Sequence, residues 1–322
     1  MELRTSRRSR LTARIIAVAA VAPTLAATLQ AAPAHAAPAT ATTRTATAAP
    51  TIATAAAAAA AVPKRENKKN RAVIFIHGYQ WDGGADCTQW NKAKSFFKDV
   101  GWTGKLITWG YYKKDKNCSV EYGGDTGTDL KYVSKSLAWH IYNNYTSKGK
   151  TVDVVGHSMG GLIIRNAIAR VKRGHAGFPS KLYVEDVVTL GTPHSGATHW
   201  WQNGCRSTQC KQINSGSGHL EWLNGLPSSN FQATGGTNWT ALGSHDDEVI
   251  SVNSATSFKA QHKIRYPTAE KVGHSDYYQT GTGTSWTYWR SSNYGKDYTK
   301  YTNRGSGPLR SAYLAVYYHS VR

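Results

Sequence analysis

Short runs of apolar, often β-branched residues recur along the chain, and amphipathic segments lie between them. The first run, from Ala72 to Ile76, is continuous rather than alternating, which is typical of a parallel strand that is buried on both faces. A glycine closely follows each of the four strongest runs and is expected to end the second one at Gly110. The predicted strands span residues 72–76, 105–109, 151–155 and 184–190, with weaker candidates at 239–242 and 263–266.

Apolar residues three and four positions apart predict helices between these strands. The first predicted helix is capped by Asp125 or Thr126 and carries an apolar stripe from residue 130 to residue 141. The second follows the third strand directly and ends at the C-cap glycine Gly174, and the last spans 308–318. Alternating strands and helices of this length predict an α/β fold with a mostly parallel central sheet and helices on both faces.

The first 36 residues have the three parts of a secretory signal peptide. They begin with five arginines against one glutamate, continue with an apolar run over 15–29, and end at the small-residue site Ala34-His35-Ala36. A membrane anchor is the alternative, but the run is short and Pro23 interrupts it. We therefore expect a secreted, extracellular protein.

The segment after the signal peptide has the composition of a linker. Residues 37–69 are mostly Ala, Thr and Pro before a charged end, and they offer no apolar face that could pack. We expect a disordered linker or pro-segment there, and a folded domain over 70–322. Residues 191–238 are rich in Gly and Ser without strong periodicity, which predicts a small cap insertion over the sheet.

The chain is strongly basic. Its formal charge is +20 at pH 7, and about +16 once the five arginines and one glutamate of the signal peptide are removed. This charge favours contact with an anionic lipid or polymer surface. No helix-turn-helix, zinc-finger or RNA-binding motif accompanies it, so nucleic acid is not an expected partner. We expect a monomer.

Four cysteines lie in the predicted folded domain, an even number that favours two disulfides in an exported protein. Three pairings are possible. We favour the local one, Cys87–Cys118 with Cys205–Cys210, because each bridge then closes a single loop. Zinc is the rival, but no C-x₂-C or H-x₃-H spacing accompanies the cysteines. No metal is therefore expected.

Residues 156–160, Gly-His-Ser-Met-Gly, match the pattern G-x-S-x-G. A predicted strand precedes the motif and a predicted helix follows it, as required for a sharp turn that exposes the hydroxyl of a nucleophilic serine. Ser158 is thus the candidate nucleophile. The tetrahedral intermediate needs two oxyanion donors. The backbone N–H groups of Met159, at the helix start, and of Tyr79, after the first strand, are the candidates.

A serine nucleophile needs a base and an acid that orients the base. In the order Ser, Asp, His, the acid follows a late strand and the histidine comes last. Asp247 is favoured over Asp246 because apolar residues return directly after it and can anchor its loop. His274, flanked by small residues after the last predicted strand, is the candidate base, and His77 is expected to be structural.

At these residues the chain resembles secreted bacterial lipases and esterases of the α/β-hydrolase superfamily. The matching blocks are residues 73–78, 156–162, 190–194 and 247–250, with His274 at the family's usual place. The resemblance implies the α/β-hydrolase fold and hydrolysis of carboxylic esters without a metal or organic cofactor. Trp81, Cys87 and Trp90, and the aromatic tail from Trp286 to Tyr301, are not part of the general pattern.

The expected substrate is therefore an ester or lipid. Exposed aromatic residues and the basic charge also suit phospholipid interfaces and solid polyesters, so a phospholipase or a polyester depolymerase is the alternative. A peptidase or amidase uses the same triad. A noncatalytic protein that binds anionic cell-surface polymer is the rival from another class, but it has no need of a complete triad.

Overall fold

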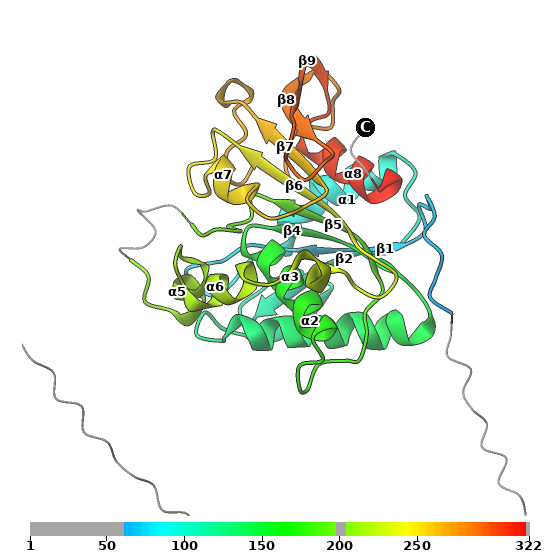
Figure 1. Ribbon diagram of the computed structural model, residues 1–322, viewed down its shortest axis with the longest axis vertical. Coiled ribbons are helices and arrows are strands. Elements are labelled where there is room, and N and C mark those ends of the chain that lie inside the picture. Colours follow the sequence, from blue (N-terminus) through cyan, green and yellow to red (C-terminus); the bar gives the residue numbers. More distant parts are fainter. Residues whose placement is uncertain (1–60, 198–203, 320–322) are drawn as a thin grey trace, which may run out of the picture. The chain divides into compact units, whose positions relative to one another are not determined.

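The computed structural model describes residues 61–197 and 204–319, which form one nine-stranded sheet with helices (Figure 1). The predicted signal peptide and most of the predicted linker lie outside the described residues. The strand order is β3-β2-β1-β4-β5-β6-β7-β8-β9, and all pairs from β3 to β7 are parallel. The strands are β1 (Ala72–Ile76), β2 (Leu106–Tyr112), β3 (Val120–Gly124), β4 (Val152–His157), β5 (Val184–Leu190), β6 (Asn238–Ser244), β7 (His262–Tyr266), β8 (Trp286–Ser291) and β9 (Thr299–Gly305).

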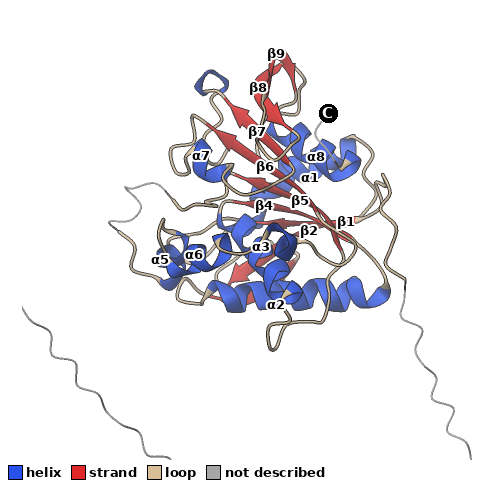
Figure 2. Ribbon diagram, viewed as in Figure 1, coloured by secondary structure: helices blue, strands red, loops and turns tan. Residues whose placement is uncertain are grey.

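Helices cover both faces of the sheet, with α2 and α3 on one face and α1 and α8 on the other (Figure 2). This confirms the predicted α/β-hydrolase fold. None of the described helices is both long and apolar enough to cross a membrane. The helices are α1 (Asn91–Asp99), α2 (Leu130–Asn144), α3 (Met159–Lys172), α5 (Thr208–Ile213), α6 (Gly218–Asn224), α7 (Val252–Ala255) and α8 (Pro308–Tyr318), with 3-10 turns η1 (Cys87–Trp90), η2 (Thr146–Lys148), η3 (Ser228–Phe231) and η4 (Thr268–Glu270).

The continuous apolar run of β1 is explained by burial on both faces. Ala72, Ile74 and Ile76 pack in the cluster beneath α2 and α3, whereas Val73 and Phe75 pack in the cluster beneath α1 and α8. Successive side chains of a strand point to opposite faces, so a central strand between two helical layers needs apolar residues at every position.

Two predicted boundaries are wrong. Strand β2 continues through Gly110 to Tyr112, and a Cβ at Gly110 would lie 2.8 Å from Cys118 Sγ. Glycine there lets the disulfide loop lie against the strand and does not stop it. Helix α2 is capped by Asp129, whose carboxylate accepts from the Lys131 N–H at 2.6 Å, and not by Asp125 or Thr126. Asp125 instead closes a turn by accepting from Gly127 N–H.

Seven helices and strands of the described residues were not predicted: α1, β3, α5, α6, α7, β8 and β9. The aromatic tail forms the antiparallel hairpin of β8 and β9, which extends the sheet beyond β7. Strand β8 carries three aromatic residues among polar ones, and β9 carries only one, Tyr301. Most side chains of both strands are at least partly exposed, so neither strand forms a continuous apolar run.

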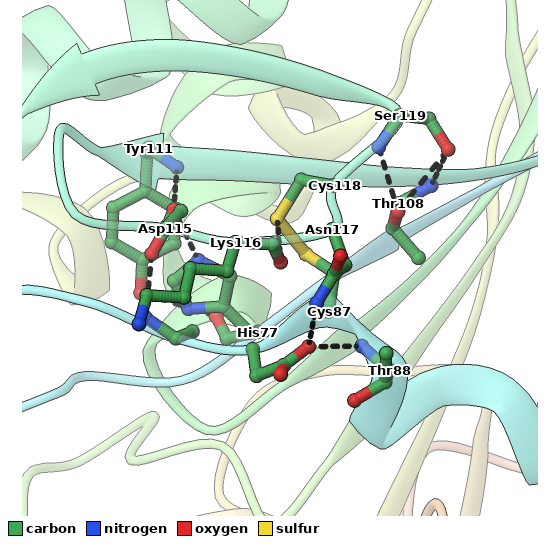
Figure 3. Close-up of a disulfide and its surroundings, with 12 residues drawn as sticks. His77, Cys87, Thr88, Thr108, Tyr111, Asp115, Lys116, Asn117, Cys118 and Ser119 are labelled. Atoms are coloured by element: carbon green, nitrogen blue, oxygen red, sulfur yellow. Dashed lines mark hydrogen bonds and ion pairs between the residues drawn. A yellow bond between two sulfur atoms is a disulfide. The ribbon is translucent and has the colours of Figure 1, made fainter.

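Both disulfides have the favoured local pairing, Cys87–Cys118 and Cys205–Cys210. The first joins η1 to the loop between β2 and β3 (Figure 3). The folded domain also begins before residue 70. Arg65 donates to the Glu185 carbonyl at 2.9 Å, and Lys69 donates to the Val100 carbonyl at 2.6 Å. The charged end of the predicted linker therefore packs on the domain.

Candidate active site

Ser158 occupies a sharp turn between β4 and α3. Its backbone has φ +52° and ψ −126°, a conformation that is strained for any residue with a side chain. The Ser158 N–H donates to the Leu190 carbonyl at 2.8 Å, which fixes the turn against β5. A Cβ at Gly160 would lie 2.4 Å from the Ile76 carbonyl oxygen, so a larger residue cannot pass under β1. The motif glycines thus permit the turn that the sequence predicts.

The turn lies where the chain order of the sheet reverses. Strands β1 and β4 are neighbours, but the chain proceeds from β1 toward β3 and from β4 toward β9. Loops that leave the carboxyl ends of two such strands diverge, and ligands bind in the crevice between them. The loop after β1 carries Gly78 and Tyr79, and the turn after β4 carries Ser158.

Asp247 and His274 form a direct pair. The His274 Nδ1–H donates to both carboxylate oxygens of Asp247 at 3.0 Å. The Asp247 side chain is fully buried, and its Oδ1 also accepts from the N–H groups of Val249 at 2.9 Å and Ile250 at 2.8 Å. These backbone N–H groups fix the carboxylate, and the Ile250 side chain is buried in a small apolar cluster that anchors the loop, as the sequence predicts. A neutral imidazole that donates from Nδ1 keeps a lone pair on Nε2, which can accept a proton.

Asp246, the alternative acid, is directed elsewhere. Its backbone N–H donates to the Ser244 hydroxyl at 3.1 Å, and within residues 61–197 and 204–319 its side chain makes no bond to His274. The structure brings His274 together with Asp247 and leaves Asp246 half-buried in the turn.

His157 links the serine turn to the loop of His274. The two imidazole rings lie 4.7 Å apart, and His157 Nε2–H donates to the backbone carbonyl of His274 at 2.8 Å. Burial, with a smaller contribution from His274, lowers the pKa of His157 well below its ordinary value. In the described parts of the chain no hydrogen bond joins the Ser158 hydroxyl to His274. Such bonds are often long without substrate and tighten when it binds.

Gly191 lies directly under the Asp247–His274 pair. Its φ is +53°, and a Cβ there would lie 2.9 Å from Asp247 Oδ2 and 3.4 Å from His274 Nδ1. Tyr277, fully buried, lies equally close to Gly191, at 2.8 Å from the same Cβ. Only a glycine lets β5 end this close to the pair, so Gly191, which the sequence analysis includes only in the matching block 190–194, is also a residue of the site.

The predicted oxyanion donors flank Ser158. Met159 is the first residue of α3, so its N–H has no carbonyl partner within the helix. The loop that carries Tyr79 touches the serine, because a Cβ at Gly78 would lie 2.7 Å from Ser158 Cβ and 3.2 Å from Oγ. Both N–H groups therefore belong to segments that contact the candidate nucleophile.

A buried polar network holds the loop of Tyr79 in place (Figure 3). His77 Nε2–H donates to Asp115 Oδ2 at 2.9 Å, and the Tyr111 hydroxyl donates to the Gly78 carbonyl at 2.6 Å. Burial raises the pKa of Asp115, but the hydrogen bond and charge of His77 outweigh burial and hold this pKa below its ordinary value. His77 is structural, as expected. Asp115 was missed, since an acid in a loop after a strand carries no signal of its own.

The surface next to this loop is aromatic. Trp81 is 52% exposed and meets Tyr79 edge to face, with the ring centroids 5.4 Å apart. The Tyr79 hydroxyl hydrogen-bonds the Ser207 hydroxyl at 2.9 Å, which joins the loop to the predicted cap insertion. The loop after β1 thus presents an exposed indole, three residues after the Gly78 that contacts Ser158.

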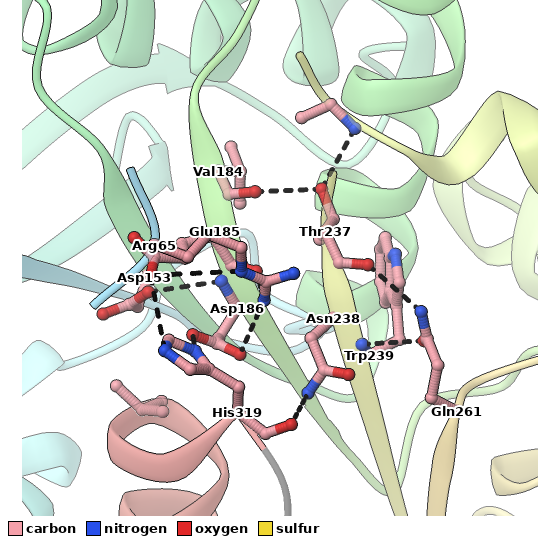
Figure 4. Close-up of polar contacts among 12 residues, drawn as sticks. Arg65, Asp153, Val184, Glu185, Asp186, Thr237, Asn238, Trp239, Gln261 and His319 are labelled. Carbon is pink, nitrogen blue, oxygen red and sulfur yellow. Dashed lines mark hydrogen bonds and ion pairs between the residues drawn. The ribbon is translucent and has the colours of Figure 1, made fainter. Parts of the chain in front are cut away.

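A second cluster of acids and a histidine lies at the opposite ends of the strands (Figure 4). Glu185, Asp186 and His319 hold atoms suited to binding a metal within 4.8 Å of one another. Two arginines already bind these carboxylates: Arg71 lies 3.5 Å from Glu185 and 3.7 Å from Asp186, and Arg65 lies 3.5 Å from Asp186. The guanidinium groups compensate the charge, so the cluster is an ion network.

The comparisons with known proteins agree with this architecture. A family model described as lipase (class 2) matches residues 70–290 of the 322-residue chain. Among curated proteins, none matches the chain significantly.

Several solved structures resemble the chain at low identity. A mature lipase from Bacillus licheniformis is 18% identical, with TM-score 0.38, over 61% of this chain and 74% of that one. A gene product from Listeria innocua is 15% identical, with TM-score 0.44, over 66% of this chain and 89% of that one. The phospholipase PlaB from Legionella pneumophila is 15% identical, with TM-score 0.42, over 58% of this chain and 44% of that one. At identities of 18% or less and TM-scores of 0.44 or less, these likenesses do not indicate a substrate or an activity.

Proposed function

Because the chain belongs to the class 2 lipase family, we propose that this lipase or esterase is a secreted serine hydrolase that cleaves carboxylic esters through an acyl-enzyme on Ser158. The observation that carries the proposal is the strained turn of Ser158 at the carboxyl edge of the sheet, beside the hydrogen-bonded pair of Asp247 and His274. A strained, nearly buried serine beside an imidazole–carboxylate pair has no structural purpose that a glycine would not serve better.

The proposed reaction begins when His274 Nε2 takes the proton of the Ser158 hydroxyl as Oγ attacks the ester carbonyl carbon. The carbonyl oxygen becomes an oxyanion, which accepts hydrogen bonds from the N–H groups of Tyr79 and Met159. The intermediate collapses as the imidazolium returns its proton to the departing alcohol, and Ser158 keeps the acyl group. Water then attacks the acyl-enzyme by the same route and releases the acid.

Asp247 stabilises the imidazolium that forms in each half of the cycle. Two backbone N–H groups and His274 hold its carboxylate in one orientation, which fixes the imidazole with Nε2 turned away from the acid. His157 supports the same loop through the His274 carbonyl. It acts as a positioning residue, because it touches the base and not the substrate.

Secretion and a lipid substrate complete the proposal. The basic, apolar and small-residue parts of residues 1–36 support export, and two disulfides suit an oxidising compartment. The exposed Trp81 beside the site supports an acyl chain or other apolar group as the bound part of the ester. The net positive charge favours substrates presented at an anionic interface, with phospholipids or polyesters as the alternatives.

The decisive experiment is the substitution Ser158→Ala, measured on a series of p-nitrophenyl esters of increasing acyl length. We expect kcat to fall by about 10⁶-fold, because no other group can form the acyl-enzyme. Circular dichroism and the thermal midpoint should show that the variant folds. A fluorophosphonate probe should label wild type and spare the variant.

Ser229→Ala is the matched control, because this serine is exposed in η3 and far along the chain from the site. It should keep wild-type turnover and labelling. Near wild-type turnover in Ser158→Ala would discard the nucleophile assignment. A folded wild type that neither turns over an ester nor takes the probe would favour the noncatalytic binding protein.

A further inference from the structure

A cavity of about 700 Å³ opens at the amino ends of the parallel strands, on the side of the sheet away from Ser158. It lies between the segment before β1, the residue before β2, and the loop that joins α2 to β4. Strand β4 has six residues from this edge to the serine turn, a rise of about 20 Å. The cavity is lined by Pro63, Lys64, Glu66, Lys68, Asn70, Arg71, Ala72, Lys105, Asn144, Tyr145, Lys148, Gly149, Lys150, Thr151 and Glu185.

Basic side chains dominate this lining, and most of their charge is not compensated. Within the described residues, four of the lysines form no ion pair with an acid, and all four are exposed. These pocket lysines are Lys64, Lys105, Lys148 and Lys150.

The two acids of the cavity are already neutralised. Glu66 forms an ion pair with Lys68. Glu185 is 2% exposed, lies 3.5 Å from Arg71 and accepts from the Glu66 N–H at 3.1 Å. The excess charge therefore belongs to the pocket lysines. A concave surface of one sign focuses its field and concentrates anions more strongly than a convex surface of equal charge.

We propose that this cavity binds a segment of a linear, phosphate-rich polymer and so holds the enzyme on a polyanionic matrix. The lysines come from three separate segments and are flexible point charges, which suit repeated phosphates along a chain better than one rigidly held anion. A flat bilayer cannot enter a concavity between a loop and the sheet edge. A polymer held at the amino edge leaves the carboxyl edge, with Ser158, free for the ester.

The proposal does not depend on the catalytic one, and its test measures binding directly. The probe is long-chain inorganic polyphosphate, with the dissociation constant measured over a series of NaCl concentrations. The pocket variant changes all four pocket lysines to Gln. The control variant has the same change in charge at exposed lysines outside the cavity, namely Lys92, Lys98, Lys113 and Lys259.

We expect the pocket variant to bind polyphosphate roughly tenfold more weakly and with a shallower salt dependence, because fewer counterions are released on binding. The control variant should lose less than about threefold. Both variants should hydrolyse a soluble ester at the wild-type rate, since the cavity is remote from Ser158. A bound polymer should leave this rate unchanged in wild type.

Equal losses in the two variants would overturn the proposal, since the effect would then follow net charge alone. A second arm uses vesicles of phosphatidylglycerol, and a third uses a DNA duplex. The proposal also fails if the pocket variant loses vesicle or duplex binding while its polyphosphate binding is unchanged. If polyphosphate binding alone depends on the four lysines, the polymer assignment stands.

Discussion

The two ends of the central sheet both bury carboxylates next to a histidine, yet they are compensated in different ways. At the amino end, Asp153 binds Arg71 at 2.8 Å and Asp186 binds His319 at 2.6 Å. At the carboxyl end, Asp247 receives two backbone N–H groups and one imidazole. The guanidinium groups of Arg71 and Arg65, joined by His319, compensate the first set of charges, whereas an imidazole and backbone N–H groups hold the second.

The electrostatic consequences follow from this difference. Burial raises the pKa of Asp153, and Arg71 opposes the rise as its direct partner. Burial would lower the pKa of Arg71, but Asp153 and Glu185 more than offset it and raise this pKa. The Arg71 guanidinium therefore keeps its proton at any physiological pH and contributes charge rather than proton transfer. An imidazole can gain and lose a proton in this range, which is the condition for general-base catalysis.

The largest expected effect that separates the two ends is that of Asp247→Asn. The amide keeps the shape of the side chain but cannot stabilise an imidazolium, and it favours the wrong imidazole tautomer. We expect kcat on a p-nitrophenyl ester to fall by about 10⁴-fold with little change in the thermal midpoint. Asp246→Asn, one residue away and without a bond to His274, is the control and should change kcat less than about threefold. A reversal of these two results would assign the acid to Asp246.

The next largest expected effect is that of Arg71→Met, which should lower the stability of the fold without lowering the activity. Arg71 is 8% exposed, and its removal strands the fully buried Asp153 without a cation. We expect the free energy of unfolding to fall by about 3–5 kcal/mol, measured with urea, while kcat of the folded enzyme stays unchanged. Arg65→Met is the control, since the Arg65 side chain is 35% exposed and should cost less than about 1 kcal/mol. Equal losses of stability in the two variants would mean that the burial of an arginine does not determine how much the ion network stabilises the fold.

The sequence predicts the parallel half of this sheet better than its antiparallel edge. The continuous apolar run of β1 and the mostly apolar runs of β4 and β5 identify these strands, because a strand covered by helices on both faces needs mainly apolar side chains. The acids in β4 and β5 lie at the amino ends of the strands, in the ion network. Most side chains of the β8–β9 hairpin are at least partly exposed, so its mixture of polar and aromatic residues is typical of a loop as well as of a strand. The local sequence pattern cannot distinguish a strand from a loop here, since the strand is defined by its pairing with β7, which is a long-range contact.

The candidate site likewise has a part that the sequence predicts and a part that it does not. Ser158 and His274 could be predicted from the motif and the chain order. The chemistry requires a serine and a histidine, and the fold determines the order in which they occur along the chain. The network of Asp115 and His77 could not be predicted, since the two residues meet only when β2 lies beside β1. The contacts of Arg65 were missed for a similar reason: a charged segment next to a linker looks solvated until the sheet supplies its buried acids.

The smallest expected effect concerns pH and the buried neutral histidines near the carboxyl edge. Burial lowers the pKa of His157 and of His194 well below the ordinary value. His194 is 0% exposed and hydrogen-bonds the Thr189 hydroxyl at 3.1 Å. The unfolded chain therefore binds protons that the folded chain does not. The stability that these neutral histidines contribute is complete above their unfolded-state pKa of about 6.5. It is lost as pH falls toward their lower folded-state pKa values.

Between about pH 6 and pH 5, where few carboxylates titrate, each such histidine should lower the free energy of unfolding by up to about 1.4 kcal/mol per pH unit. His194→Gln should remove one such contribution from the slope, whatever it does to stability at pH 7.5. Thr189→Val is the matched control: it removes the hydrogen bond but no titrating group, so it should lower the curve without changing its slope. Urea unfolding at half-unit pH steps measures both. An unchanged slope in His194→Gln would mean that His194 takes up a proton in the folded state. The contrast between buried neutral histidines at one edge of the sheet and an arginine-based ion network at the other would then fail at this residue.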